Sequence, residues 1–257
     1  MLLVSWNVNG LRSVVAKGAW ENFLKTRGEA ADVICLQETR CAAVCAVELL
    51  TSPEFPHVYA SACECSKGYS GVALLSKRPA VEVSYDLPGA PEARREGRVV
   101  TATFPDAVVV CCYVPNSKPK LERLAYRLEV WGPAFRAHIS KVSKAGLPVF
   151  VCGDMNVAHR ALDIHNPDDK RPRPGYTDGE RADFEALLSE CKLVDAFRSV
   201  WPKRAGAYSW WSNFAKSRER NKGWRIDYVL STRAKPERAD VWADVLGSDH
   251  APVWADY

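Results

Sequence analysis

The segment Val149-Phe-Val-Cys-Gly-Asp-Met-Asn156 organises the rest of the chain. Its four apolar residues follow Pro148 and predict a strand buried on both faces, because the run is too short for a helix. Gly153 ends the run, and Asp154 and Asn156 then point the same way, since side chains alternate along an extended segment. Open α/β sheets place their sites at such carboxyl ends of strands. The alternative is an ordinary Asp/Asn turn after a core strand.

Length and composition suit one globular domain spanning residues 1–257, with 47% hydrophobic residues available for a core. The 35 basic and 31 acidic residues leave a net charge of +4, so a site for a polyanion requires local clustering. No stretch approaches the roughly 18 apolar residues of a membrane span. Residues 1–6 lead directly into a strand-like run. We therefore expect no membrane partner and an intracellular protein, nuclear if eukaryotic and cytoplasmic if prokaryotic.

The nine cysteines favour a reducing compartment over a disulfide framework, since their number is odd. Four of them lie in apolar strand-like runs and are Cys35, Cys111, Cys112 and Cys152. The pairs Cys41 with Cys45 and Cys63 with Cys65 lack the usual zinc spacing, and no histidine completes a set. We expect free thiols.

Apolar runs bounded by turn residues predict many strands. They cover 2–6, 32–37, 56–62, 71–76, 80–85, 98–104, 107–114, 148–153, 207–211, 225–231, 239–245 and 250–256. Many of these runs are neighbours joined by short turns, which favours mixed or antiparallel sheets over a βαβ series.

Helices are fewer, and they are predicted at 13–27, 41–50 and 177–191, the last capped by Thr177 with Glu180 three residues later. Apolar residues at spacings of three and four predict a longer helix over 121–139. Gly132-Pro133 inside it should bend or split it. The polar, proline-rich stretch 164–176 is either exposed padding or a binding loop. The pattern predicts two sheets with helices outside them.

Seven polar residues stand where apolar strands stop, although each alone is more often a cap or a turn residue. They are Asn7, Glu38, Tyr113, Asn116, Asp227, Asp249 and His250. Metal-assisted hydrolysis of a phosphodiester needs such a set, because Mg²⁺ prefers carboxylate oxygens with waters and substrate phosphate, and the attacking water needs an acceptor. A histidine beside an aspartate provides an oriented imidazole for phosphate contact or proton transfer.

Motifs spread over residues 5–252 resemble, in order, those of exonuclease-III-type apurinic/apyrimidinic endonucleases. The matching segments are Asn7-Val-Asn-Gly-Leu-Arg12, Leu36-Gln-Glu-Thr39, Gly68-Tyr-Ser-Gly-Val72, Tyr113-Val-Pro-Asn116, Gly153-Asp-Met-Asn156, Trp224-Arg-Ile-Asp-Tyr228 and Gly247-Ser-Asp-His250. Gly-Asp-x-Asn and Ser-Asp-His alone mark only the wider metal-dependent phosphoesterase superfamily. Tyr-Val-Pro-Asn and Trp-Arg-Ile-Asp-Tyr point to the abasic-site branch.

The resemblance implies a DNase-I-like four-layer α/β sandwich of two packed mixed β-sheets flanked by helices. It also implies one Mg²⁺-dependent site between the sheets, in which Mn²⁺ would substitute. The implied metal site comprises Asn7, Asn9, Glu38, Asp154, Asn156, Asp249 and His250. The implied catalytic residues are Tyr113, Asp154, Asn156, Asp227 and His250. Among these, Asp154 resembles the residue that activates water, and Asp227 the one that orients His250 against the phosphate.

The implied reaction is hydrolysis of the phosphodiester 5′ to an abasic site in duplex DNA, leaving a 3′-hydroxyl and a 5′-deoxyribose phosphate. The resemblance leaves open 3′-phosphodiesterase or 3′→5′ exonuclease activity, and one or two metal ions. Such an enzyme must extrude the lesion into a small pocket. Trp210, Trp224 and Ile226 resemble its apolar lining, with hydrophobic core as the alternative.

The other implied DNA contacts are Arg12, Lys17, Tyr69, Arg98, Asn116, Arg123, Asn166, Lys170 and Arg173, for which solvated surface is the alternative. A segment next to Trp224 favours a local cluster of positive charge, since it contains Lys216, Arg218, Arg220 and Lys222. We expect a monomer and leave protein partners open. Asn9 stands where mammalian members carry aspartate, and Val4 replaces a cysteine linked there to redox activation, so that second role is not transferred.

Two alternatives remain at this stage. A phosphoesterase of the same superfamily could act on a small molecule or lipid. A catalytically inactive DNA-binding module is the other, and the complete set of acidic, amide and histidine residues argues against it.

Overall fold

Each of two six-stranded sheets is built around one parallel pair of strands, in a computed structural model that describes residues 1–169, 173–233 and 235–257. The strand orders are β13-β14-β1-β2-β4-β3 and β5-β6-β7-β8-β12-β9. In the first sheet β1 (Leu2–Asn7) is parallel to β2 (Val33–Gln37), and in the second β7 (Val108–Tyr113) is parallel to β8 (Val149–Asp154). The remaining pairings are antiparallel, which confirms the predicted mixed sheets.

The other strands flank these central pairs. In the first sheet they are β3 (His57–Ser61), β4 (Val72–Ser76), β13 (Arg238–Val241) and β14 (Val253–Asp256). In the second sheet they are β5 (Glu82–Ser84), β6 (Val99–Thr103), β9 (Val194–Asp195) and β12 (Asp227–Ser231). A separate antiparallel ribbon pairs β10 (Trp210–Trp211) with β11 (Gly223–Trp224).

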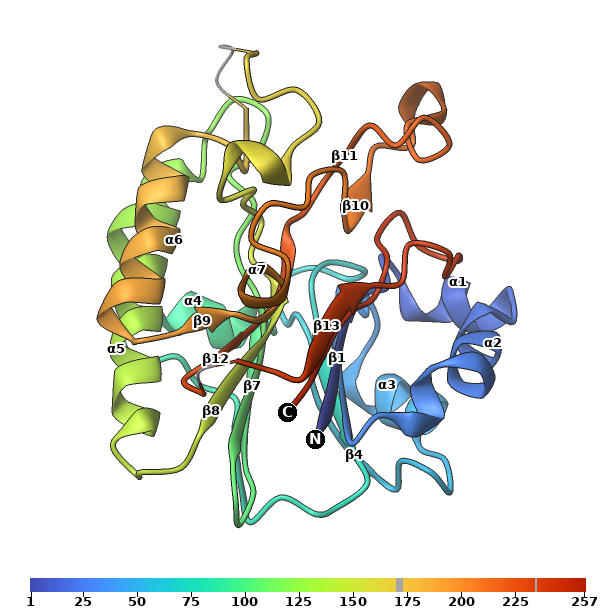
Figure 1. The fold of residues 1–257 in the computed structure, drawn as a ribbon. Helices are drawn as coiled ribbons and strands as arrows, with labels where there is room; N and C mark the ends of the chain where they lie inside the picture. Colours follow the sequence, from blue (N-terminus) through green and yellow to red (C-terminus); the bar gives the residue numbers. More distant parts are fainter. Residues whose placement is uncertain (170–172, 234) are drawn as a thin grey trace.

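The two sheets pack face to face, and helices cover both outer faces (Figure 1). Alternation along each strand divides its side chains between these layers: Leu3 lies between the sheets, whereas Val4 faces the helices. The first sheet is covered by α1 (Leu11–Ala16), α2 (Ala19–Thr26) and α3 (Ala43–Leu50). The second is covered by α4 (Pro91–Arg95), α5 (Gly132–Ser143) and α6 (Asp178–Glu190). The expected four-layer α/β sandwich is confirmed.

Two predicted helices differ from the expectation. The helix predicted at 13–27 is broken at Gly18, whose φ of 67° lies in the left-handed region that glycine tolerates. The helix predicted at 121–139 starts later than expected, since residues 124 and 125 are the first helical ones and the π-helix η2 (Tyr126–Trp131) follows them. Pro133 does not break this segment, because it lies in the first turn of α5, where its missing N–H falls at the junction of two helices.

The prediction for α6 is confirmed in detail. Thr177 accepts a hydrogen bond from the Glu180 amide, and the Glu180 side chain accepts one from the Thr177 amide. The nine cysteines are free, as expected. Among the described residues no helix has both the length and the apolar character that crossing a bilayer requires.

Gly153 allows β8 to approach β7 at the end of the central parallel pair. A Cβ atom at this position would lie 2.1 Å from the carbonyl oxygen of Cys112, which only a shift of the backbone could relieve. The glycine of the Gly-Asp-x-Asn segment is therefore required by strand packing, and it places Asp154 at the edge of the sheet.

A buried ion network braces the turns beside β12. Asp163 accepts hydrogen bonds from the guanidinium groups of Arg198 and Arg225, and Arg225 also donates to Asp195 over 2.7 Å. Arg198 lies in the short helix α7 (Ala196–Val200), which packs against β12. Burial alone would raise the pKa of Asp163, but the charges and hydrogen bonds of Arg225 and Arg198 lower it to about 2.

This network predicts acid destabilisation in a defined window. Because the folded pKa of Asp163 is below its unfolded value, its contribution is complete above about pH 4 and disappears as the pH falls towards 2. We expect a loss of about 2 kcal/mol of unfolding free energy from this group, measured by urea unfolding at several pH values. Asp163→Asn should flatten the profile in this window, whereas Asp244→Asn, at an exposed ion pair with Arg27, should not. Parallel profiles for all three proteins would contradict the assignment.

Candidate active site

The carboxyl ends of both parallel strand pairs meet at one edge of the sandwich. Tyr113 and Asp154 are direct neighbours there in the second sheet, and Asp227, the first residue of the antiparallel β12, faces Asp154 from the other side. A cavity of about 560 Å³ opens at this edge. It is lined by Asn9, Glu38, Arg40, Tyr69, Tyr113, Asn116, Lys118, Pro119, Asp154, Asn156, Arg173, Pro174, Gly175, Trp210, Trp224, Ile226, Asp249 and His250.

The backbone turns sharply where these strands end. Asn9, Glu38 and Asn156 have φ values of 46°, 52° and 49°, in the left-handed region that residues with a Cβ rarely occupy. The turns are held by long-range bonds, including that from the Gly10 amide to the Glu38 carbonyl over 2.8 Å. Strained backbone of this kind concentrates at functional sites, where the surrounding structure compensates for it.

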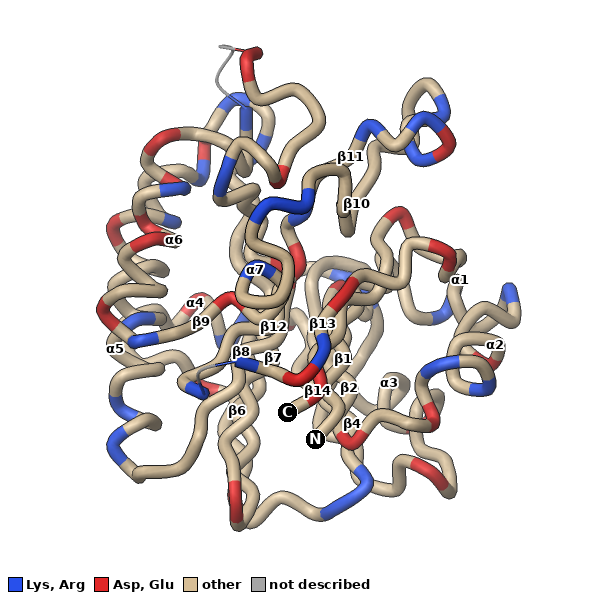
Figure 2. The backbone as a smooth tube through the Cα atoms, in the orientation of Figure 1, with Lys and Arg blue, Asp and Glu red and all other residues tan. Residues whose placement is uncertain are grey.

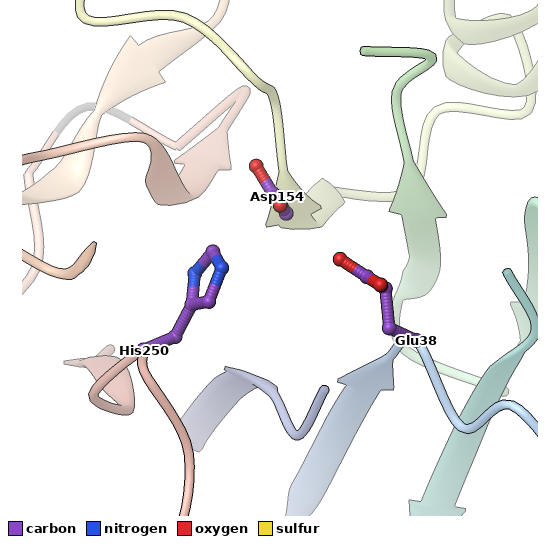
Figure 3. Close-up of side chains that lie close together, drawn as sticks. All are labelled: Glu38, Asp154 and His250. Atoms are coloured by element: carbon purple, nitrogen blue, oxygen red, sulfur yellow. The ribbon is translucent and has the colours of Figure 1, made fainter. Parts of the chain in front are cut away.

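Glu38, Asp154 and His250 point toward one another from β2, β8 and the segment before β14 (Figure 3). Their potential ligand atoms all lie within 4.8 Å of one another. Asn7 joins the two carboxylates, since its Nδ2 donates to Glu38 Oε1 over 3.0 Å and to Asp154 Oδ2 over 2.9 Å. Its own Oδ1 accepts from the Asn9 amide. Asn7 therefore orients both acids, and its oxygen already has a partner.

The donor set fits a hard divalent cation. Asn9 Nδ2 donates to Asp249 Oδ1 over 2.8 Å, and Trp210 Nε1 donates to Asp249 Oδ2 over 3.1 Å. Asn9 Oδ1 is buried and has no hydrogen-bond partner in the described part of the chain. A buried amide oxygen without a partner, in the cavity that Glu38, Asp154 and Asp249 also line, is an acceptor that Mg²⁺ or a similar cation would satisfy.

His250 is held as a cation. Its Nδ1 lies 2.8 Å from Asp227 Oδ2 in a buried pair. Burial by itself would lower the pKa of His250, but the charge and hydrogen bond of Asp227 raise it to about 10. An imidazole that is charged at neutral pH suits contact with a phosphate oxygen, whereas ligation of a metal requires the neutral ring.

The pKa values of the acids differ with their surroundings. Burial and the charge of Asp227 raise the pKa of Asp154. Burial would also raise the pKa of Glu38, but the hydrogen bond from Asn7 and the charge of Arg40 outweigh it and lower that pKa. Burial, together with the charges of Glu38 and Asp154, raises the pKa of Tyr113, so its hydroxyl keeps its proton. A bound cation would favour the ionised form of Asp154.

The two amides form a connected pair on the second sheet. Asn116 Nδ2 donates to Asn156 Oδ1 over 2.9 Å, and Asn156 Nδ2 donates to the Val114 carbonyl over 2.8 Å. The Asn156 amide N–H donates to Asp154 Oδ1 over 2.8 Å. The second hydrogen of each side-chain amide remains available to an oxygen in the cavity.

An aromatic wall closes one side of the cavity. Trp210, Trp224 and Ile226 belong to one small apolar cluster, and the two indole rings are perpendicular with centroids 5.9 Å apart. The guanidinium of Arg173 lies over Trp224, 5.3 Å from the ring centroid. The structure therefore brings these four predicted contacts into the same cavity as the acidic cluster.

Other predicted DNA contacts are more scattered. Tyr69 and Asn116 line the cavity, whereas Arg12, Lys17 and Asn166 are exposed outside it. Arg98 is only 1% exposed and donates to Tyr69 Oη and to the Tyr113 carbonyl, so its guanidinium supports these residues from behind. Arg123 is half-buried and bound to Glu96. The expectation of surface contacts from Arg98 was wrong because its side chain is enclosed. Lys170 lies outside the described residues.

Sequence reasoning missed Arg40 and Phe214. Arg40 lines the cavity and is paired with Glu38. Phe214 is 82% exposed on the connection between β10 and β11, among basic positions that project beyond the strand ends (Figures 1 and 2). The sequence carried no clear signal for Phe214, because single apolar residues are common on protein surfaces.

Comparisons with known proteins agree with this arrangement. The model of the endonuclease/exonuclease/phosphatase family matches residues 4–250. An exodeoxyribonuclease of Bacillus subtilis is 44% identical over 98% of both chains, and the DNA repair nuclease APEX1 of Danio rerio is 42% identical over 98% of this chain and 81% of its own. The crystal structure of an AP endonuclease from Leishmania major superposes with a TM-score of 0.86 at 27% identity, covering 100% of this chain and 87% of that one. The chain belongs to the endonuclease/exonuclease/phosphatase family.

Proposed function

We propose that this protein is a DNA repair endonuclease that hydrolyses the phosphodiester 5′ to abasic sites in duplex DNA. The observation that carries the proposal is the shared cavity, in which an aromatic chamber for a bare sugar adjoins an acidic and histidine cluster for a phosphate. The names of the relatives, an exodeoxyribonuclease and a DNA repair nuclease, support it. A 3′→5′ exonuclease or 3′-phosphodiesterase activity would use the same site on a strand end.

The cation would be Mg²⁺, with Mn²⁺ as a substitute, held by Glu38 and the oxygens of Asp154 and Asn9, with Asp249 nearby. When bound, it would neutralise charge on the phosphate and polarise it. Asp154 then accepts the proton of the attacking water. Burial and the charge of Asp227 raise the pKa of Asp154, which makes its carboxylate a stronger base. Asn156 and the charged His250 donate to phosphate oxygens, with Asp227 holding the imidazole in place. The protonated Tyr113 hydroxyl contacts the leaving oxygen.

The surroundings of the cavity suit a duplex. Tyr69, Asn116 and Arg173 line it, and Arg12 and Lys17 are exposed beyond it. The β10–β11 connection adds basic residues and Phe214, whose exposed ring can contact the open step beside an extruded nucleotide. We expect a monomer that works inside the cell, in the nucleus or the cytoplasm according to the organism, where free thiols persist.

The alternatives are weaker. A small-molecule or lipid phosphoesterase would need no basic, aromatic extension beside its site. A catalytically inactive DNA-binding module would not retain Glu38, Asp154 and the His250–Asp227 pair in hydrogen-bonded register.

The first test is a cleavage assay on a duplex oligonucleotide with one abasic site. We expect Mg²⁺-dependent cleavage 5′ to the lesion, no cleavage with EDTA, and much slower attack on the intact duplex. Inositol phosphates serve as the competing substrate class. Hydrolysis of inositol phosphates without cleavage of abasic DNA would favour the small-molecule alternative, and a folded protein active on neither would favour the inactive module.

Asp154→Asn removes the proposed acceptor while keeping the size of the side chain. We expect cleavage to fall by about 10²–10⁴-fold, the usual contribution of a positioned base, while binding of the abasic duplex persists. Single-turnover rates and gel-shift affinities measure the two effects. Normal cleavage by this variant would remove Asp154 from the mechanism.

Trp224→Ala opens the aromatic wall. Because a larger chamber no longer excludes an intact nucleotide, we expect the ratio of kcat/KM for abasic over intact DNA to fall by about tenfold. Trp201→Ala is the matched control, since Trp201 lies outside the cavity and is 41% exposed. Equal effects of the two substitutions would argue against a discriminating role for Trp224.

A further inference from the structure

A buried ion pair lies directly behind the cavity without lining it. Arg127 Nη1 and Glu180 Oε1 are 3.0 Å apart, and their side chains are 3% and 0% exposed. Arg127 lies in the π-helix η2 and Glu180 in the first turn of α6. Buried ion pairs often contribute little net stability compared with apolar residues of the same size. The role of this pair is therefore better indicated by the other groups to which Arg127 and Glu180 are hydrogen-bonded.

Arg127 binds the backbone that carries the two site amides. Its Nη1 donates to the Asn156 carbonyl over 2.8 Å and to the Pro115 carbonyl over 3.4 Å, and its Nη2 donates to the Met155 carbonyl over 2.7 Å. Asn156 has the left-handed φ of 49°, so its conformation needs external support. A single guanidinium group therefore ties together the segments that present Asn116 and Asn156.

Glu180 binds the 173–177 loop, which also lines the cavity. Its Oε2 accepts from the Gly175 amide over 2.9 Å and from the Thr177 amide over 3.0 Å, and its Oε1 accepts from Ser117 Oγ over 2.6 Å. The bond from the Thr177 amide is part of the capping box of α6, whereas the bonds from Gly175 and Ser117 play no part in capping the helix. Glu180 thus joins the 173–177 loop to the segment after Asn116.

Gly175 shows how closely that loop meets the site. A Cβ atom there would lie 2.9 Å from the Asn156 carbonyl oxygen and 3.3 Å from Trp224 Cζ3, and its φ is 82°. The loop therefore packs against both the catalytic turn and the aromatic wall. Moving it would displace Asn156 and Trp224 together.

We propose that Arg127 and Glu180 are positioning residues that set the phosphate-facing amides Asn116 and Asn156 in register with the Trp224 wall. The inference rests on the proposed function, because it concerns the alignment of lesion pocket and scissile phosphate. Both residues act through the groups they hold and contact no substrate. Glu38 and Asn9 follow strands of the other sheet, so the pair reaches the proposed cation site only through Asp154, whose Oδ1 accepts from the Asn156 amide.

Three variants test the proposal on the full chain: Arg127→Lys, Glu180→Gln and the double substitution Arg127→Met with Glu180→Gln. The double variant leaves no unpaired buried charge, so it should remain folded. We expect kcat on abasic duplex to fall by about 10- to 100-fold in each, the size of effect that a shift of about 1 Å produces. Mn²⁺ affinity, followed by electron paramagnetic resonance, should fall by less than kcat does, because Glu38 and Asn9 lie on the other sheet. Discrimination against intact DNA should weaken.

The matched control is Arg136→Met with Asp183→Asn. Arg136 in α5 and Asp183 in α6 form another ion pair that links α6 to the helix following η2, but neither lines the cavity or bonds to its loops in the described structure. We expect this variant to lose stability and keep its kcat. If the Arg127 and Glu180 variants, at equal folded fraction, also keep wild-type kcat, the proposal is overturned.

Hydrogen exchange separates this proposal from the proposed function. The backbone amides of residues 116–117, 155–157, 173 and 175–177 should exchange faster in the Arg127 and Glu180 variants and remain unchanged in the control. Unchanged exchange in all variants would overturn the positioning role whatever the substrate. Failure of the unaltered protein to cleave abasic DNA would overturn the proposed function instead, while the exchange result would still decide the role of the pair.

Discussion

The structure depends on one geometric constraint, the presence of a parallel strand pair at the centre of each sheet. Parallel neighbours end at the same edge, so β1 with β2 and β7 with β8 each deliver two chain turns to one place. Face-to-face packing then brings the two edges together. Residues as distant in sequence as Asn7 and Asp154 form a hydrogen bond of 2.9 Å only because both sheets contribute their carboxyl ends to one cleft.

That convergence gathers buried carboxylates such as Asp154 and Asp227, and the chain compensates with fixed donors. Asn7 bonds to two carboxylates, Arg40 pairs with Glu38, and His250 remains charged beside Asp227. These contacts leave an uncompensated acceptor at Asn9 Oδ1, where a hard cation would complete the set. The electrostatics of the site and the proposed need for a metal therefore have the same origin.

Support for this cleft comes from buried polar groups outside it. Arg98 holds Tyr69 and the backbone of Tyr113, and Arg127 holds the carbonyls around Asn156. Each guanidinium donates several hydrogen bonds to polar groups that hydrophobic contacts alone could not orient, because apolar packing has no directionality. Arg98 was expected to contact DNA at the surface, but its side chain is buried and supports other residues of the site.

Sequence alone determined the local features of this protein. Apolar runs identified most of the strands, the Thr177–Glu180 pair identified the start of α6, and the ordered motifs identified the family, because these signals depend on neighbouring residues or on spacing. The tertiary structure decided which polar residues share the cavity, that Arg98 and Arg127 lie behind it, and that Phe214 projects beside it. Those outcomes depend on how two sheets pack and how loops cross between them. Contacts of that kind join residues far apart in the chain, and no local pattern encodes them.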